Sequence, residues 1–275
     1  MSTTLILGIG AAVLGLIVGS FLNVVAHRLP EGGSLVHPPS ACPGCGRGIR
    51  PWENIPIVSF FLLRGRCAGC GRGIGWSYPI TEALAGVTTA TAAVVAGPGA
   101  ALGPALLLTW LLLALARIDW DRQILPNELN AGLALSGALL SLTGLALPAL
   151  AAGNGQAVGL PLPLDALAGG ALGYGLLFAA AWGYARATGK EGMGGGDIKL
   201  LGALGIWVGP VGVPLALFLA AIGGTIIGGG ILILRGRSRN VPIPFGPFLA
   251  LGGWALFLWQ EPIVRWYLQL SGIAP

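Results

Sequence analysis

Charged side chains are scarce in this chain of 275 residues: Asp, Glu, Lys and Arg make up 9% of it, whereas hydrophobic residues make up 55%. A soluble domain carries roughly 25% charged residues, so this composition excludes an ordinary soluble protein. We predict an all-α polytopic membrane protein with about eight transmembrane helices, for which the lipid bilayer is the first partner. The expected spans are Leu5–Ala26, Pro79–Ala96, Leu102–Ile118, Leu129–Ala149, Leu164–Ala185, Ile198–Val208, Val211–Leu234 and Pro247–Trp259.

One of these spans is ambiguous. Ile198–Val208 is too short to cross a bilayer comfortably, and Gly209-Pro210 separates it from Val211–Leu234. The short segment is therefore expected to be tilted, half-buried or joined to its neighbour around a kink.

Several catalytic motifs are missing. The chain has no Gly-x-Ser-x-Gly and no His-Glu-x-x-His, and no Gly-x-Gly-x-x-Gly follows a predicted strand. Gly189-Lys190 does not form a phosphate loop, because Glu191 stands where Ser or Thr is required. These absences exclude the common serine hydrolases, zinc proteases and nucleotide-binding folds.

Basic residues are distributed unevenly between the expected loops. All of them except Arg265 fall in alternate loops, which the positive-inside rule places in the cytoplasm, with both termini outside. The first span has no basic residue before it and Arg28 after it, the reverse of a signal peptide, so we expect it to be retained. Topology and anionic lipid account for the net charge of +5, and no nucleic-acid partner is expected.

The four cysteines all lie in the predicted cytoplasmic loop between His27 and Tyr78. They form two similar hooks, Cys42-Pro-Gly-Cys45 and Cys67-Ala-Gly-Cys70. This spacing is typical of a structural Zn²⁺ site with four thiolates, which would hold a small loop together. Two disulfides or four free thiols are the alternatives, although disulfides are rare in the cytoplasm. His27 and His37 are expected to be solvated or interfacial, because four thiolates already satisfy zinc.

Two aspartates occupy unusual positions at the ends of apolar runs. Asp119 ends one run and Asp197 opens another, directly after Gly194, Gly195 and Gly196. Carboxylates are costly near hydrocarbon, so both are candidate site residues. We predict an aspartyl dyad at the cytoplasmic face, with the three glycines and Lys199 supporting the loop or the substrate. The structural alternative is that these acids cap helices or form ion pairs, Asp119 with Arg117 or Arg122, and Asp197 with Lys199.

Several motifs of the chain together resemble those of a known family. The matching motifs run from the first span to the last: Gly19-Ser-Phe-Leu-Asn23, the two cysteine hooks, Tyr78-Pro79 with Glu82, Ile118-Asp119 before Leu125-Pro126, Gly192-Met-Gly-Gly-Gly-Asp197-Ile-Lys199, and Pro242-Ile-Pro-Phe-Gly-Pro247. Together they are similar to the bifunctional type IV prepilin peptidases. Family members often have Pro-Asp after the first aspartate motif, whereas this chain has Pro126-Asn127.

The resemblance implies an enzyme of the bacterial inner membrane. Such an enzyme cleaves the basic leader from type IV prepilins and type II secretion pseudopilins at the cytoplasmic face. It then methylates the new N-terminal residue with S-adenosylmethionine. The catalytic aspartates of the family fall on Asp119 and Asp197. Glu82 is a weak candidate for binding the methyl donor.

Two alternatives to this function stay open at the level of sequence: a peptidase without methyltransferase activity, and a channel or transporter with a zinc-stapled loop. A transporter predicts acids near the midplane of the membrane, not at one face. The expected organisation is a first transmembrane helix at 1–26, a zinc domain at 27–78 and a transmembrane peptidase domain at 79–275.

Overall fold

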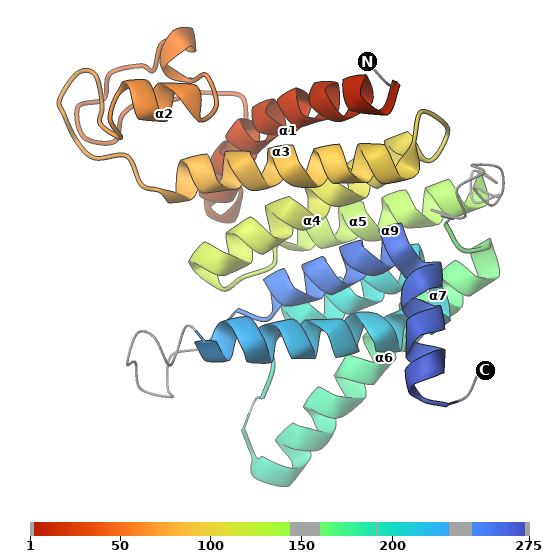
Figure 1. Ribbon diagram of the computed structural model, residues 1–275. Coiled ribbons are helices and arrows are strands. Elements are labelled where there is room, and N and C mark those ends of the chain that lie inside the picture. Colours follow the sequence, from red (N-terminus) through yellow and green to blue (C-terminus); the bar gives the residue numbers. More distant parts are fainter. Residues whose placement is uncertain (1–2, 144–159, 191, 231–243, 273–275) are drawn as a thin grey trace. The chain divides into compact units, whose positions relative to one another are not determined.

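A computed structural model describes residues 3–143, 160–190, 192–230 and 244–272 (Figure 1). Within these residues the secondary structure is helical, with two isolated β-bridges and no strand. The chain divides into two compact units, Met1–Val94 and Val95–Pro275, which are described separately below. The predicted all-α membrane fold with a small cysteine loop is confirmed.

The first unit consists of two long helices and the loop between them. Helix α1 spans Thr3–Arg28 and α3 spans Ser77–Ala96; the short elements η1 (Leu29–Glu31), η2 (Pro51–Glu53) and α2 (Val58–Leu62) lie between them. Glycines let α1 approach α3 closely. A Cβ at Gly15 would lie 2.4 Å from the carbonyl oxygen of Ala85, and one at Gly19 would lie 2.7 Å from the Cα of Glu82. Small residues allow this kind of backbone contact between apolar helices.

The second unit contains α4 (Leu102–Arg122), α5 (Asn127–Leu142), α6 (Pro163–Thr188), α7 (Gly195–Gly223), the π-helical turn η3 (Gly224–Gly228) and α9 (Gly246–Leu270). Glycines again set the packing. A Cβ at Gly169 of α6 would lie 2.2 Å from the carbonyl oxygen of Gly205 of α7, and a Cβ at Gly173 would lie 2.4 Å from that of Leu201. Trp207 of α7 is fully buried and donates a hydrogen bond from Nε1 to the Leu133 carbonyl of α5 at 2.7 Å.

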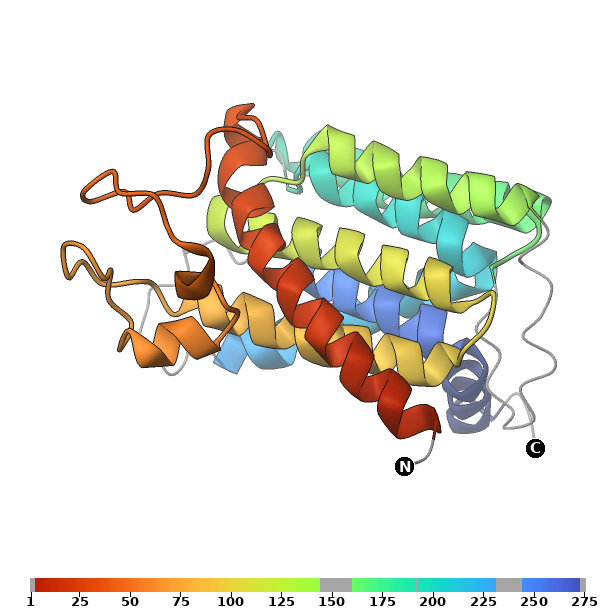
Figure 2. The same ribbon diagram turned by 90° about the horizontal axis from the view of Figure 1, so that it is seen from above.

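Helix α7 reverses its direction at Gly209, whose φ of 70° and ψ of 177° are not helical. In a straight helix Leu204 and Ala216 would be about 18 Å apart along the axis. Both nevertheless lie against adjacent residues of α9, Leu204 at Gly253 and Ala216 at Gly252. The chain therefore folds back on itself, and α7 consists of two arms that both pack against α9 (Figures 1 and 2).

The two arms correspond to the expected spans Ile198–Val208 and Val211–Leu234. Glycine supplies the left-handed φ that the reversal requires, and Pro210 follows with the fixed φ that begins a new helix. The sequence left open whether these segments are tilted, half-buried or joined, and the structure shows two adjacent arms joined by a sharp turn. Residues 231–234 of the second expected span lie outside the described residues.

Among the described residues, five helices are long and apolar enough to cross a membrane: Thr3–Glu31, Ser77–Ala96, Leu102–Arg122, Pro163–Thr188 and Gly195–Ile227. The last of these contains both arms of α7. Helices α5 and α9 also occupy expected spans, although residues 144–149 of the span Leu129–Ala149 lie outside the described part. These helices support a polytopic fold, and the total of about eight spans stays a prediction.

Candidate active site and metal centre

Asp119 lies in the last turn of α4 and is only 5% exposed. Its Oδ2 accepts a hydrogen bond from the backbone N–H of Gly246 at 3.0 Å. Gly246 is the first residue of α9, so the carboxylate lies at the N-terminus of a helix far away in the sequence. A helix N-terminus presents free N–H groups and a partial positive charge, which together favour an anion.

Asp197 lies in the first turn of α7 and is partly buried. Its carboxylate is close enough to Asp119 for the charge of that residue to act on it. Leu125 confirms that the segments meet: a Cβ at Gly196 would lie 3.0 Å from the Leu125 Cβ, and one at Gly246 would lie 3.3 Å from its Cδ2. The end of α4 and the beginnings of α7 and α9 therefore converge; the N-terminus of α9 points to Asp119, and Asp197 lies in the first turn of α7, where an acid is favoured.

Neighbouring charged residues have other partners. Arg117 forms an ion pair with Asp121, and Lys199 donates a hydrogen bond from Nζ to Asn127 Oδ1 at 2.7 Å. The structural alternative paired Asp119 with Arg117 or Arg122, and Asp197 with Lys199; among the described residues, Arg117 and Lys199 have Asp121 and Asn127 as their partners instead. Asp121 is exposed, in contrast to the buried Asp119 two residues before it.

The glycines before Asp197 differ in how tightly they are packed. A Cβ at Gly194 or Gly195 would meet nothing within 4 Å, whereas one at Gly196 would press on Leu125. None of the three has a positive φ. Of the three positions, only 196 requires a glycine to avoid a clash within the protein. Gly194 and Gly195 leave open space at the edge of the acid site.

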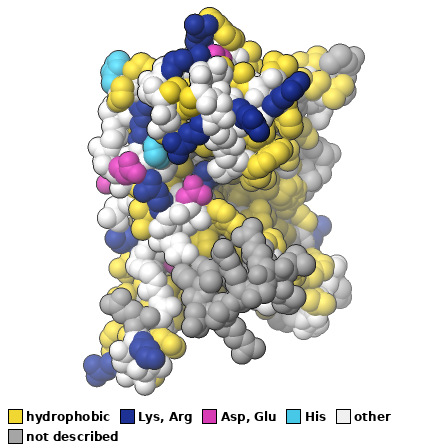
Figure 3. Space-filling view, turned by 90° about the vertical axis from the view of Figure 1, so that its left-hand side faces the viewer, with side chains coloured by type: hydrophobic (Ala, Val, Ile, Leu, Met, Phe, Trp, Pro, Cys, Tyr) yellow, Lys and Arg dark blue, Asp and Glu magenta, His cyan; other side chains and the backbone are white. Residues whose placement is uncertain are grey.

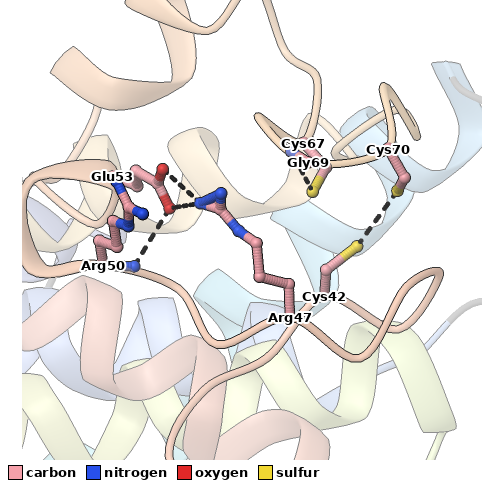
Figure 4. Close-up of polar contacts among 7 residues, drawn as sticks. All are labelled: Cys42, Arg47, Arg50, Glu53, Cys67, Gly69 and Cys70. Carbon is pink, nitrogen blue, oxygen red and sulfur yellow. Dashed lines mark hydrogen bonds and ion pairs between the residues drawn. The ribbon is translucent and has the colours of Figure 1, made fainter.

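The four cysteines form one cluster, in which each Sγ lies within 4.8 Å of the other three. The Sγ atoms of Cys42 and Cys70 are 3.8 Å apart (Figure 4). All four cysteines are free. This spacing fits zinc, because Zn–S bonds of about 2.3 Å in a tetrahedron place the sulfur atoms roughly 3.8 Å apart. A disulfide would instead require about 2.05 Å. The geometry therefore favours a metal over the disulfide alternative.

The two hooks are built alike. The backbone N–H of Gly44 points to Cys42 Sγ at 3.4 Å, and that of Gly69 points to Cys67 Sγ at 3.3 Å. Each hook closes on a glycine of positive φ, Gly46 at 70° and Gly71 at 71°, a conformation that other residues adopt rarely. The near-copy hooks in the sequence thus form near-copy structures.

The electrostatic environment of the cluster differs from one sulfur to another. The backbone N–H groups of Gly44 and Cys45, with neighbouring thiols, lower the pKa of Cys42 to about 6. For Cys70 the N–H of Arg72 acts to lower the pKa, but the Cys45 thiol, burial and the other thiols outweigh it and raise the pKa to about 11. A bound cation would deprotonate all four, because a coordinated thiol loses its proton outright.

An ion pair braces the loop beside the cluster. Arg47, two residues after the first hook, donates to both carboxylate oxygens of Glu53, and the backbone N–H of Arg50 donates to Glu53 Oε2 at 3.1 Å (Figure 4). The hydrogen bonds from Arg47 and then Arg50 lower the pKa of Glu53.

Both His27 and His37 are exposed and outside the cysteine cluster, as expected. Histidine and basic side chains are visible at the surface in Figure 3.

The sequence identified the aspartates and cysteines but gave no role to Gly246 or Asn23. Both occur in the motifs that carry the family resemblance, yet neither has chemistry that a sequence pattern reveals. Gly246 contributes only its backbone N–H to Asp119. Asn23 is 6% exposed on α1, and Glu82 is 8% exposed on α3. Asn23 and Glu82 line the same cavity of the first unit.

Comparison with protein families matches residues 13–96 to the bacterial peptidase A24 N-terminal domain and residues 106–229 to the type IV leader peptidase family. The chain is 40% identical over 279 aligned residues to a prepilin leader peptidase/N-methyltransferase of Aeromonas salmonicida, covering 92% of this chain and 91% of the relative. A protein of the same description from Pseudomonas aeruginosa is 42% identical, with 94% and 92% covered. One from Xanthomonas campestris is 35% identical, with 96% and 95% covered. No solved structure matches significantly.

Proposed function

Because this chain belongs to the type IV leader peptidase family, we propose that it cleaves the leader from type IV prepilins and type II secretion pseudopilins and then methylates the new N-terminal residue. The relatives that cover nearly the whole chain carry both activities in their descriptions, which favours two activities over a peptidase alone.

One observation carries the peptidase assignment: Asp119 and Asp197 lie 78 positions apart in the sequence, yet the segments that carry them meet where the end of α4 and the beginnings of α7 and α9 converge. Both acids lie at helix ends. A transporter would instead need its acids near the midplane, within broken helices. The alternative of a channel or transporter is therefore not favoured.

The proposed mechanism uses the two carboxylates as one unit. Two close carboxylates cannot both ionise cheaply, so they share one proton. The ionised carboxylate removes a proton from water as the water attacks the scissile carbonyl. The protonated one hydrogen-bonds to the carbonyl oxygen and then donates its proton to the leaving amine. The Gly246 N–H holds the Asp119 carboxylate in place by its hydrogen bond to Oδ2.

The substrate fits a site at the end of membrane helices. A prepilin has a basic leader followed by an apolar helix, so its scissile bond lies near the membrane surface. We place the dyad and the cysteine loop in the cytoplasm and both termini in the periplasm, since the basic residues flank the dyad side of the spans. Gly194, Gly195 and Lys199 lie beside the acids, where the cleaved peptide would pass.

We assign a structural Zn²⁺ to the four cysteines. The cluster uses all four thiols as ligands, so the metal has no open position for substrate and would hold the loop in its fold. The methyl donor is S-adenosylmethionine, which supplies an electrophilic methyl group when bound.

Mass spectrometry of a prepilin peptide tests the proposed function. Purified protein in detergent or nanodiscs is incubated with the peptide, with and without S-adenosylmethionine. We expect leader removal in both samples and a gain of one methyl group at the new N-terminus only with the donor. If folded protein leaves the peptide unchanged, the proposed peptidase activity is rejected. Cleavage without methylation would leave the peptidase-only alternative.

A further inference from the structure

The first unit contains a cavity of about 270 Å³ between the end of α1, the cysteine loop and the beginning of α3. Most of its surface is apolar, as in pockets that bind small ligands, where a few polar groups fix the orientation of the ligand. The residues that line it include a buried carboxylate, Glu82, and a buried amide, Asn23.

Glu82 is an acid with uncharged hydrogen-bond partners. Its Oε2 accepts a hydrogen bond from the backbone N–H of Ile57 at 2.7 Å, and the Ser20 side chain also donates to the carboxylate. Buried charges are normally paired with an opposite charge. By contrast, Glu53, which lines the same cavity, already has Arg47 as its cationic partner.

The backbone at Ile57 is strained. Its φ of 62° is uncommon for any residue except glycine and is an outlier for a β-branched one. This conformation directs the Ile57 N–H to Glu82 and so holds the carboxylate in position. Strained conformations of this kind persist where the surrounding structure enforces them, often at binding sites.

Asn23 presents an unpaired oxygen. Its Nδ2 donates to the Tyr78 carbonyl at 3.2 Å, which identifies that atom as the nitrogen because a carbonyl oxygen accepts only from a donor. The remaining atom, Oδ1, is buried and has no hydrogen-bond partner among the residues that the structure describes. A buried acceptor that lacks a donor costs free energy, so a ligand with N–H groups would satisfy it.

We propose that Glu82 and Asn23 form a subsite for a primary ammonium group. An ammonium carries three donors and a positive charge, which match the Asn23 oxygen, unpaired among the described residues, and the Glu82 carboxylate, whose partners there are uncharged. The inference rests on the proposed methyltransferase activity, which supplies two sources of such a group: the α-ammonium of S-adenosylmethionine and the N-terminal ammonium of the cleaved pilin.

Ligand binding to full-length protein tests the subsite and separates the two sources. Wild type, Glu82→Gln and Asn23→Leu are titrated with S-adenosylmethionine and with its analogue that lacks the α-amino group. The same proteins are titrated with a cleaved pilin peptide and with its N-acetylated form. Thr81→Val is the matched control, since Thr81 is buried on α3 beside Glu82 but does not line the cavity.

We expect Glu82→Gln to weaken one of the two ammonium ligands by about 10- to 100-fold, the range for a lost hydrogen bond to a charged group. Asn23→Leu should weaken the same ligand, and neither change should affect the partner ligand that lacks the ammonium. The affected ligand identifies the source. Unaltered affinity for both ammonium ligands in either folded variant would overturn the subsite, as would equal losses for the forms without the ammonium.

Folding and the proposed function are checked separately. Zinc content and thermal unfolding show whether each variant is folded, and if Glu82→Gln is not, Asn23→Leu carries the same comparison. Leader cleavage should persist in both, because the aspartates belong to α4 and α7. If wild type cleaves and binds but does not methylate, the methyltransferase proposal fails while the binding comparison still decides the subsite.

Discussion

At the scale of single residues, the acid site depends on atoms that the fold brings together over long distances in the sequence. Asp119 belongs to α4, its hydrogen-bond donor Gly246 to α9, and its partner Asp197 to α7. The exposed Asp121 pairs with Arg117 and lies outside this arrangement. These differences make the dyad testable by single substitutions.

Asp119→Asn and Asp197→Asn preserve shape but remove the titrating proton. We expect each to lower the rate of leader cleavage by roughly 100- to 10,000-fold, the usual contribution of an acid or base. The double variant should be little worse, because the pair acts as a unit. Cleavage is measured by mass spectrometry on protein shown to be folded. Asp121→Asn is the control and should keep most activity, and near-normal cleavage by either single variant would mean that its carboxylate is structural.

Gly246→Ala tests the positioning of Asp119. The added Cβ would lie 2.6 Å from Asp119 Oδ2 and must displace the carboxylate or the start of α9. We expect this misplacement to lower the rate of leader cleavage by about 100-fold. Gly132→Ala is the matched control, because a Cβ there would meet nothing within 4 Å. Equal activities of the two variants would show that the carboxylate does not need its observed position.

At the scale of elements, the cysteine loop is a small structure whose folding depends on its ligands. Its two hooks contribute paired turns and its regular elements are short, so the packed apolar core is small. Metal binding would supply much of the folding free energy of such a loop.

Cys→Ser at position 42, 45, 67 or 70 should remove about one equivalent of zinc and loosen the loop, because the site needs all four thiolates. Metal analysis and limited proteolysis measure the two effects. His37→Ala should retain the metal, since His37 is exposed and outside the cluster. Full zinc content in all four cysteine variants would eliminate the site.

At the scale of the whole molecule, the peptidase needs its two aspartates on one side of the membrane. The contacts of Leu125 with the segments at Gly196 and Gly246 require the ends of α4, α7 and α9 to meet. The sense of insertion, in contrast, rests on the distribution of basic residues.

Cysteine labelling in intact cells tests both statements. Cysteines introduced at Gln123 and Gly195 should be protected from a membrane-impermeant reagent, and one at Thr143, beyond the other end of α5, should be labelled. Wild type corrects for the native cysteines. Opposite labelling of positions 123 and 195 would contradict the fold, and exposure of both at the outer surface would contradict the cytoplasmic active site.

The sequence by itself determined the features that depend on local order along the chain. Hydropathy identified membrane helices, because each must satisfy its own backbone hydrogen bonds in lipid. The spacing of Cys42, Cys45, Cys67 and Cys70 predicted a four-thiolate cluster, because each hook is a local turn. The setting of Asp119 and Asp197 marked them as candidates, because carboxylates beside apolar runs are costly.

Only the tertiary structure decided which of these features meet. The reversal at Gly209 turned an ambiguous short span into one arm of a hairpin, since contacts with α9 define its direction. The N–H of Gly246 reaches Asp119 across 127 positions, and a glycine reveals no such role in a sequence. Asn23 and Glu82 likewise line one cavity because α1 and α3 pack closely at Gly19. A sequence pattern reports the neighbours along a helix, whereas packing between helices selects the partners across them.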